Sequence, residues 1–404
     1  MSFRPALLAG VSTLGLVAGA CALAWREGSP LVPRDGGLAD QGTAVPFLVL
    51  LAGAFVAYLV GLVLLRRSGP SAARPVVVLA VAVQLVPLAT PLLLSTDAWT
   101  YWGYGWIAGE GGGNPYVDPP AAFPESPAAP YVGAAWRDTT TVYGPAFTLA
   151  SEPVARVAGS SADAAAWLFK GLAAAGILVA LAAVVRVSSR PALAAAFVGW
   201  NPLLAVHGAG GGHNDAIVGG LAALAVALAV RRRHALAGAA WALASLVKWV
   251  PIVFLVLASL AARSRRRPIG AGGIALVSLA VAALATWRYD LDWLRVVGPL
   301  ADNAALETSY ALPSRLEELG VPETVALGLA GIAAVAGLLW LGRRALAGEP
   351  SLGRAACLVL LVTPYLAVWY LAWAVPLAAS EEDRLARVAA LALTAYLLPQ
   401  TIPV

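Results

Sequence analysis

Residues 45–65 read VPFLVLLAGAFVAYLVGLVLL, an apolar run without a single charged residue. A helix of about 20 such residues crosses the roughly 30 Å hydrocarbon core of a bilayer. Comparable runs recur along the whole chain, whereas a transmembrane barrel would alternate in polarity and turn about every ten residues. The sequence therefore predicts an all-α polytopic membrane protein.

The composition supports the same class. Of the 404 residues, 60% are hydrophobic and only 12% are charged, which is too few to give a soluble protein its surface. The net charge of +5 comes from short basic clusters between the apolar runs, so it does not indicate nucleic acid as a partner. Cys21 and Cys357 lie inside apolar runs and show neither a disulfide nor a metal-binding pattern.

We expect one domain, residues 1–404, formed by a bundle of about 11–13 membrane helices, some of them short or re-entrant. The first run could be a signal peptide, but its length and the lack of a clear cleavage site favour a retained anchor. The expected spans are 6–25, 45–65, 76–94, 164–185, 192–207, 214–230, 269–286, 322–342 and 386–401.

The arginines predict the orientation of the bundle, because Lys and Arg are retained on the cytoplasmic side. Most of them fall in alternate loops, which places the N-terminus in the cytoplasm. The loops 95–142 and 287–321 then face outward, at the outer surface of the cell membrane. The clusters assigned to the inner side are Arg4, Arg66/Arg67/Arg74, Arg186/Arg190, Arg231–Arg233, Arg263/Arg265–Arg267, Arg343/Arg344/Arg354 and Arg384/Arg387.

Two further apolar stretches, 235–262 and 355–379, each have basic residues at both ends. A single crossing would place one of the two basic ends outside. We therefore expect each stretch to enter and return as two short helices, with Lys248 at the first turn and Trp369 and Tyr370 at the second. Non-helical backbone at that depth must line a watery cavity or be buried in protein.

The first outer loop carries DAWTYWGYGW near its start, and Asp97, the first residue of this motif, is the leading candidate for catalysis. A carboxylate at the mouth of a membrane helix is costly unless water, a partner or a substrate meets it. In a helix, Asp97, Tyr101 and Tyr104 share one face, and three tryptophans share another that would suit the lipid headgroup level. The alternative is a plain interfacial helix on which Asp97 is only a capping residue.

A second polar group follows in GAGGGHND, residues 208–215, and a third at Lys248. His213, Asn214 and Asp215 could bind substrate, or Asn214 and Asp215 could simply cap the next helix. Lys248 should have an anionic partner, either a lipid-linked phosphate or a carboxylate of the protein, unless it reaches the interface. The remaining candidates for substrate binding are polar or aromatic residues near predicted turns. They are Asn114, Tyr116, Arg137, Asp138, Tyr143 and Arg315.

The order of the motifs along the chain resembles that of a known family. The sequence D-A-W-T-Y-x-x-x-G from Asp97 is followed by G-N-P-Y, W-R-D, Y-G-P, G-H-N-D-A, K-W-x-P and W-Y-x-x-W. Together they resemble the actinobacterial polyprenol-phosphate-mannose-dependent α-1,6-mannopyranosyltransferases, which are GT-C-type membrane glycosyltransferases. The chain departs from the pattern at Trp106, where an arginine is expected, and it is shorter than expected for such enzymes.

The resemblance implies an outward-facing active site, a polyprenyl-phosphate sugar donor, and a glycan or glycolipid acceptor. Asp97 stands at the position of the general base, and Lys248 at the position that would meet the donor phosphate. No cofactor and no metal site is predicted from residue spacing, and the metal requirement stays open. The alternatives are transfer of another sugar such as arabinofuranose, or a lipid-linked sugar flippase, although no inverted repeat supports a transporter.

Overall fold

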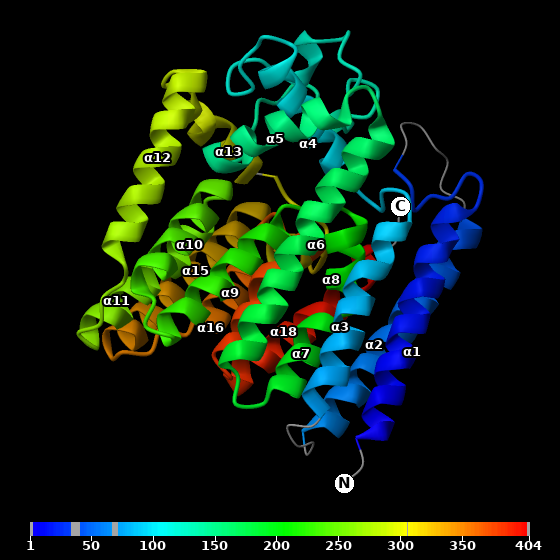
Figure 1. Ribbon diagram of the computed structural model, residues 1–404, viewed down its shortest axis with the longest axis vertical. Helices are drawn as coiled ribbons and strands as arrows, with labels where there is room; N and C mark the ends of the chain where they lie inside the picture. Colours follow the sequence, from blue (N-terminus) through cyan, green and yellow to red (C-terminus); the bar gives the residue numbers. More distant parts are fainter. Residues whose placement is uncertain (1–2, 34–40, 67–71, 305, 402–404) are drawn as a thin grey trace.

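The computed structural model describes residues 3–33, 41–66, 72–304 and 306–401, and every regular element among them is a helix (Figure 1). Arg67, one of the arginines assigned to the inner side, lies outside the described residues. Five helices are long and apolar enough to cross a membrane. They are α1 (Arg4–Ala22), α2 (Gln41–Leu65), α6 (Ala162–Val187), α12 (Ala271–Tyr289) and α15 (Glu323–Leu346).

Shorter apolar helices complete the bundle, and most begin or end within a few residues of the expected spans. These are α3 (Ala73–Leu85), α9 (Asp215–Val230), α10 (His234–Val247), α11 (Pro251–Ser264), α16 (Leu352–Val362), α17 (Leu371–Ser380) and α18 (Arg384–Leu397).

The expected span at 192–207 is a broken helix rather than a continuous one. α7 (Pro191–Gly199) and the segment that starts with α8 (Pro202–Ala205) meet at an angle of 56°. Pro202 has no N–H to continue the ladder. Asn201 starts the new helix instead, with its side-chain oxygen accepting the N–H groups of Leu203 and Leu204 at 3.1 and 3.2 Å.

The outer helices of the bundle expose apolar side chains. On α12, Leu276 is 71% exposed, and on α15, Ile332 is 68% exposed. Only 11% of the most apolar part of α12 and 17% of that of α15 is buried inside the protein. Such surfaces are unfavourable in water and favourable in lipid, so the chain is a polytopic membrane bundle, as predicted.

Both expected helical hairpins are confirmed as helix–turn–helix pairs. The start of α10, at His234, and the end of α11, at Ala262, line one pocket, so the two helices return to the same end of the bundle. For α16 and α17, the N–H of Gly353 donates to Glu381 at 2.8 Å, which joins the start of α16 to the end of α17.

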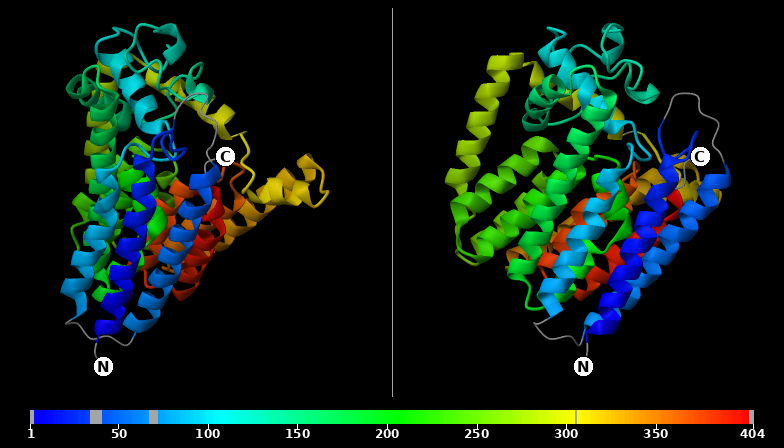
Figure 2. Two further views of the ribbon diagram at one scale, coloured as in Figure 1. Left: turned by 90° about the vertical axis from the view of Figure 1, so that its right-hand side faces the viewer. Right: turned by 45° about the vertical axis from the view of Figure 1, so that its right-hand side comes forward.

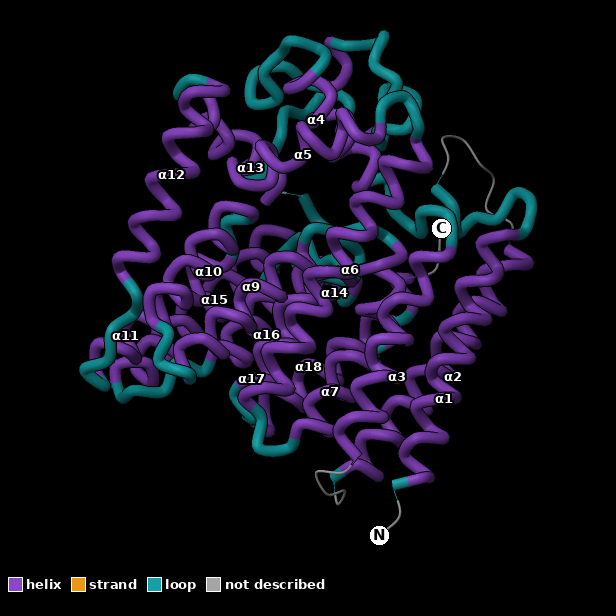
Figure 3. The backbone as a smooth tube through the Cα atoms, in the orientation of Figure 1, coloured by secondary structure: helices purple, strands orange, loops and turns teal. Residues whose placement is uncertain are grey.

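The long loop and the N-terminus lie at opposite ends of the molecule (Figures 1 and 3). The loop end contains α4 (Asp97–Gly109), α5 (Pro145–Ala158) and, beyond α12, α13 (Val297–Ala304). The segment of α14 (Leu312–Glu318) and the adjacent start of α15 projects sideways from the bundle (left view of Figure 2).

The tryptophan face of α4 does not lie against lipid headgroups, so that part of the prediction is wrong. Trp99 and Trp102 are buried, and both pack against Tyr131 of the long loop, with ring centroids 5.2 and 6.2 Å away. The loop covers this face with apolar residues of its own, among them the buried Ala128 and Val132. α4 is therefore a buried helix of the loop end rather than an interfacial one.

Candidate functional site

The backbone that leads into Asp97 is held by three separate parts of the chain. The N–H groups of Leu93 and Leu94 donate to the carbonyls of Gly210 and Leu31 at 3.1 and 2.8 Å. Leu94 has a φ of 63°, a left-handed conformation that a leucine adopts only when its surroundings impose it. The buried ammonium of Lys170 donates to the carbonyl of Thr90 at 2.5 Å.

The Asp97 carboxylate is fixed by hydrogen bonds to its Oδ2. Tyr101, one turn further along α4, donates its hydroxyl at 3.3 Å, and Nδ1 of His213 lies 3.0 Å away. Burial raises the pKa of Asp97, but the hydrogen bond from His213 and the positive charge of Lys248 outweigh burial and hold that pKa below its ordinary value. Asp97 is therefore a carboxylate at neutral pH.

The tripeptide His213–Asn214–Asp215 joins Asp97 to the rest of the cluster. It follows a short π-helix, Val206–Gly210, and Gly212 at φ 71°, which turn the chain into α9. Asn214 precedes α9 without making a side-chain capping bond, so the capping alternative is wrong. The ring of His213 stacks on Trp369, with centroids 3.9 Å apart and planes 10° from parallel.

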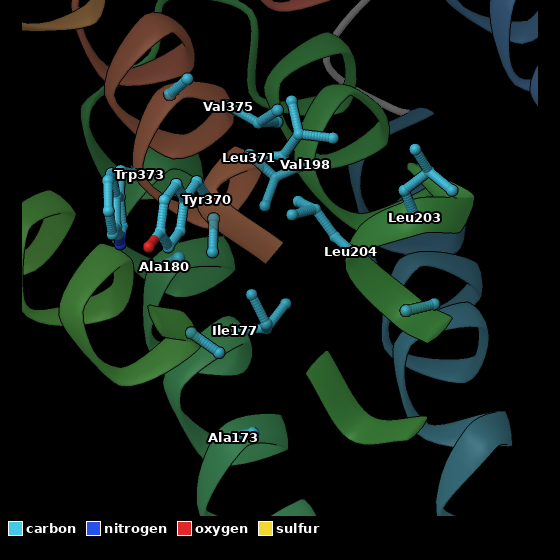
Figure 4. Close-up of a cluster of buried hydrophobic side chains, with 14 of the residues drawn as sticks. Ala173, Ile177, Ala180, Val198, Leu203, Leu204, Tyr370, Leu371, Trp373 and Val375 are labelled. Carbon is cyan, nitrogen blue, oxygen red and sulfur yellow. The ribbon is translucent and has the colours of Figure 1, made fainter. Parts of the chain in front are cut away.

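Lys248 lies at the break between α10 and α11, as predicted, and its partner within the protein is Asp215. The ammonium donates to both carboxylate oxygens at 2.8 and 3.0 Å. It also lies 5.0 Å from the ring centroid of Tyr370 and 5.4 Å from that of Trp373. These two rings stack with centroids 4.2 Å apart and stand side by side in Figure 4.

Two glycines bring the elements of the site together. A Cβ atom on Gly219 of α9 would lie 1.8 Å from the carbonyl oxygen of Ala372, so only glycine lets α17 approach this closely. A Cβ atom on Gly144 would lie 2.1 Å from the carbonyl oxygen of Leu246, next to Lys248. The first contact places the Tyr370 helix against Asp215, and the second places the outer loop against the Lys248 turn.

Two side chains of the cluster, Asp97 and Lys248, are partly exposed, whereas His213 and Asp215 are buried. The side chains of Asp97 and Lys248 are 13% and 20% exposed, whereas those of His213 and Asp215 are each 1% exposed. Asp97 and Lys248 can therefore contact a substrate, while His213 and Asp215 hold these two side chains in position.

The structure thus brings together Asp97, Tyr101, His213, Asn214, Asp215, Lys248, Trp369 and Tyr370 from the predicted set. Tyr143 is one step removed, because it packs edge-on against Tyr101 with centroids 5.0 Å apart. Tyr104 points elsewhere and donates to the carbonyl of Thr139 at 2.8 Å.

Five other predicted residues take no part in the cluster. Arg137 donates to the carbonyl of Val132 at 3.4 Å, and Asp138 is exposed on the loop. Asn114 donates to Asp292 at 3.1 Å, and Tyr116 donates to Thr148 at 3.0 Å. Arg315 pairs with Glu318 at 2.6 Å, on the surface of the projecting segment.

Three residues of the cluster were not among the predicted site residues. Ser95 accepts the N–H of Asp97 at 3.1 Å, and Trp373 lies beside Lys248. Tyr365 lies against Tyr370, with ring centroids 6.3 Å apart. Trp373 could have been found, because it follows Tyr370 by three residues and so shares its helix face. Ser95 and Tyr365 carry no sequence signal of this kind.

Within the described part of the chain, no three His, Cys, Asp or Glu side chains gather as a metal site would require.

Comparison with known proteins identifies the family. A family model described as "Alpha-(1->6)-mannopyranosyltransferase, N-terminal domain" matches residues 7–264. The chain is 26% identical over 258 residues to Alpha-(1->6)-mannopyranosyltransferase A of Corynebacterium glutamicum, covering 57% of this chain and 52% of that protein. It is 30% identical over 153 residues to the protein of the same name from Mycobacterium tuberculosis, covering 36% of this chain and 29% of that protein.

The chain therefore spans about half, or less, of the length of these relatives. No solved structure matches it. The family match covers the part of the chain that carries Asp97, the His213–Asp215 tripeptide and Lys248, and it confirms the resemblance drawn from the motifs. The chain belongs to the alpha-(1→6)-mannopyranosyltransferase family.

Proposed function

We propose that this protein is an inverting mannosyltransferase that moves mannose from a polyprenyl-phosphate donor to a hydroxyl of a glycan or glycolipid acceptor. The family membership supports the sugar and the reaction class. The observation that carries the proposal is the convergence of Asp97 and Lys248, 151 positions apart in the sequence, on the two ends of the tripeptide His213–Asn214–Asp215.

Asp97 is the general base of the proposed reaction. The acceptor oxygen attacks the anomeric carbon of the donor sugar and transfers its proton to the Asp97 carboxylate. The bond between that carbon and the donor phosphate oxygen breaks, and its electron pair leaves with the phosphate. Direct displacement inverts the anomeric centre, so a β-linked donor gives an α-linked product. Tyr101 and His213 keep the carboxylate in position.

Lys248 stabilises the leaving phosphate. An ammonium has three N–H groups, and the single carboxylate of Asp215 leaves capacity for a phosphate oxygen on the exposed side. A cation held in place before the reaction stabilises the growing negative charge without reorganisation. The stacked pair Tyr370 and Trp373 holds the ammonium by cation–π contact and keeps it from turning away.

The donor tail lies in the bilayer, and the sugar reaches the loop end of the molecule. The exposed apolar faces of α12 and α15 support this arrangement because they place lipid beside the bundle. The arginine-rich turns at the opposite end support a cytoplasmic N-terminus and an active site on the outer face.

The decisive experiment is sugar transfer from a synthetic polyprenyl-phosphate mannose by the purified protein in detergent, where transport cannot be measured. Asp97→Asn should lower transfer by about 10²- to 10⁴-fold with an unchanged melting temperature. Glu125→Gln makes the same kind of change at an exposed acid of the same loop and should leave the rate unchanged.

Two outcomes would overturn the proposal. Asp97→Asn could retain near-normal transfer, which would remove Asp97 as the base. Alternatively, the wild-type protein could transfer no sugar to any acceptor in detergent yet move the lipid-linked sugar across vesicle membranes, as a flippase does. A matched donor that carries arabinofuranose instead of mannose tests the identity of the sugar in the same assay.

A further inference from the structure

A groove rich in arginine lies at the end of the molecule opposite the candidate site. It has a volume of about 480 Å³ and lies between the end of α2, the start of α7 and the start of α18. These three ends lie at the same end as the N-terminus (Figure 1). Its basic lining residues are Arg66, Arg190, Arg384 and Arg387, and its one acidic lining residue is Glu382.

The groove carries uncompensated positive charge. Glu382 is already engaged, because it accepts the hydroxyl of Ser188 and the backbone N–H of Ser189, both at 2.6 Å. Arg387 donates to the carbonyl of Ala379 at 3.2 Å, and it is attracted by the charge of Glu382 and repelled by that of Arg190. Four arginines therefore share one carboxylate, which leaves the groove with a net positive charge.

Three of the four arginines form no ion pair with a carboxylate of the described part of the chain. Within the described ranges, no hydrogen bond or ion pair engages the side chains of Arg66, Arg190 or Arg384. Cations gathered in this way create a positive potential that attracts an anion.

Each of the three helices changes from basic to apolar as it leaves this end of the bundle. On α2, Leu62 lies one turn deeper than Arg66. On α7, Leu193 and Phe197 follow Arg190, and on α18, Val388 and Leu391 follow Arg384. Val388 is 54% exposed, so the apolar wall is accessible from the side. A free anion would need only the arginines, whereas this groove also offers an apolar wall one to two turns deeper.

We propose that this groove binds the phosphate of an anionic phospholipid, with the arginines around the headgroup and the apolar wall along the start of the acyl chains. Basic pockets between membrane helices on the cytoplasmic side recognise lipids of this kind. A second pocket at the same end, of about 400 Å³, is a weaker candidate. Its Arg344 is already paired with Glu349, and its Asp383 with Arg354.

The test titrates the purified full chain in a neutral detergent with phosphatidylglycerol and counts bound lipid by native mass spectrometry. Phosphatidylcholine and inorganic phosphate are titrated in parallel. Wild-type protein should bind phosphatidylglycerol more tightly than either. The double variant Arg190→Gln/Arg384→Gln should bind phosphatidylglycerol about thirty-fold more weakly, and each single variant about five-fold more weakly.

The matched control is Arg231→Gln/Arg263→Gln, which removes two exposed arginines at the same end but outside the groove. It should leave binding within about two-fold of wild type. Equal weakening by both double variants, equal binding of phosphatidylcholine, or equal binding of inorganic phosphate would each overturn the proposal. If the groove double variant fails to fold, the two single variants decide the question.

Discussion

Two groups of polar side chains lie at the loop end of this molecule, and they differ in how fully the protein uses their hydrogen-bonding capacity. In the first group, the loop clasp, Asn114 donates to Asp292 and to the carbonyl of Tyr289, at 3.1 and 3.3 Å. Glu152 pairs with both Arg156 and Arg288, at 2.5 and 3.0 Å. The Asn114 bonds and the Glu152–Arg288 pair tie one segment of the protein to another, whereas the Glu152–Arg156 pair lies within α5.

The second group is the candidate site, and its capacity is only partly used. The three N–H groups of Lys248 meet one carboxylate, that of Asp215. The side-chain amide of Asn214 is buried and has no partner among the described residues. A buried polar group without a protein partner is costly, so it marks a place where water, an ion or a ligand can supply one. Both groups are polar, and they differ in their unused hydrogen-bonding capacity, which the candidate site has and the loop clasp lacks.

The largest expected effect comes from breaking the Lys248–Asp215 pair on one side. Lys248→Met leaves the carboxylate of Asp215 buried and unpaired, which typically costs about 3–5 kcal/mol of stability. If Lys248 also stabilises the leaving phosphate, kcat/KM should fall by about 10²- to 10³-fold. Thermal melting in detergent and the transfer assay measure the two effects.

The double variant Lys248→Met/Asp215→Asn separates stability from chemistry. It removes both charges, so most of the melting temperature should return, because no buried charge is left alone. Activity should stay low, because no cation meets the phosphate. A double variant that regains both stability and activity would show that the pair is structural and would place Lys248 with the clasp.

The next effect concerns pH. Asp97 has a pKa below its ordinary value, so its carboxylate form persists to lower pH than that of an unperturbed aspartate. Activity should therefore be retained through mildly acidic pH and be lost only as pH falls through this lowered pKa. In His213→Ala the hydrogen bond to Oδ2 is gone while burial remains, so the pKa of Asp97 should rise.

The measurement is the pH profile of kcat/KM for wild type and for His213→Ala. The acidic limb should move to higher pH in the variant, with a loss of about ten-fold or more at the optimum. His234→Ala is the matched control, because His234 lies at the other end of α10, away from the site. An unmoved acidic limb in His213→Ala would mean that His213 does not set the pKa of the base.

Much of the fold could be predicted from the sequence because hydrocarbon thickness limits what a membrane helix can be. The apolar runs became α1, α2, α6, α12 and α15 with shifts of a few residues. Charge at both ends of 235–262 and 355–379 predicted the two hairpins. The break at Trp200–Asn201 could not be predicted from hydropathy, because both halves are equally apolar.

Site residues could be predicted from the sequence only where a charged residue interrupts an apolar stretch. Asp97 and Lys248 stood out because a charge inside an apolar stretch needs a partner. Asn114 and Tyr116 were also candidates, but their bonds hold the loop to the end of α12 and to α5. Tertiary contacts decide which polar residues form all their hydrogen bonds within the protein. A sequence pattern does not contain these contacts.

The smallest expected effect tests the clasp. Asn114→Ala removes two donated bonds and the bond that its Oδ1 accepts from the N–H of Tyr116 at 3.1 Å. Leaving such partners unsatisfied costs about 1–3 kcal/mol, so the melting temperature should fall. Glu125→Gln, an exposed change on the same loop, should alter stability by less than about 0.5 kcal/mol. At a temperature where both variants are folded, kcat/KM should match that of wild type. A fall in kcat/KM with an unchanged melting temperature would instead place Asn114 at the substrate and erase the distinction between the clasp and the site.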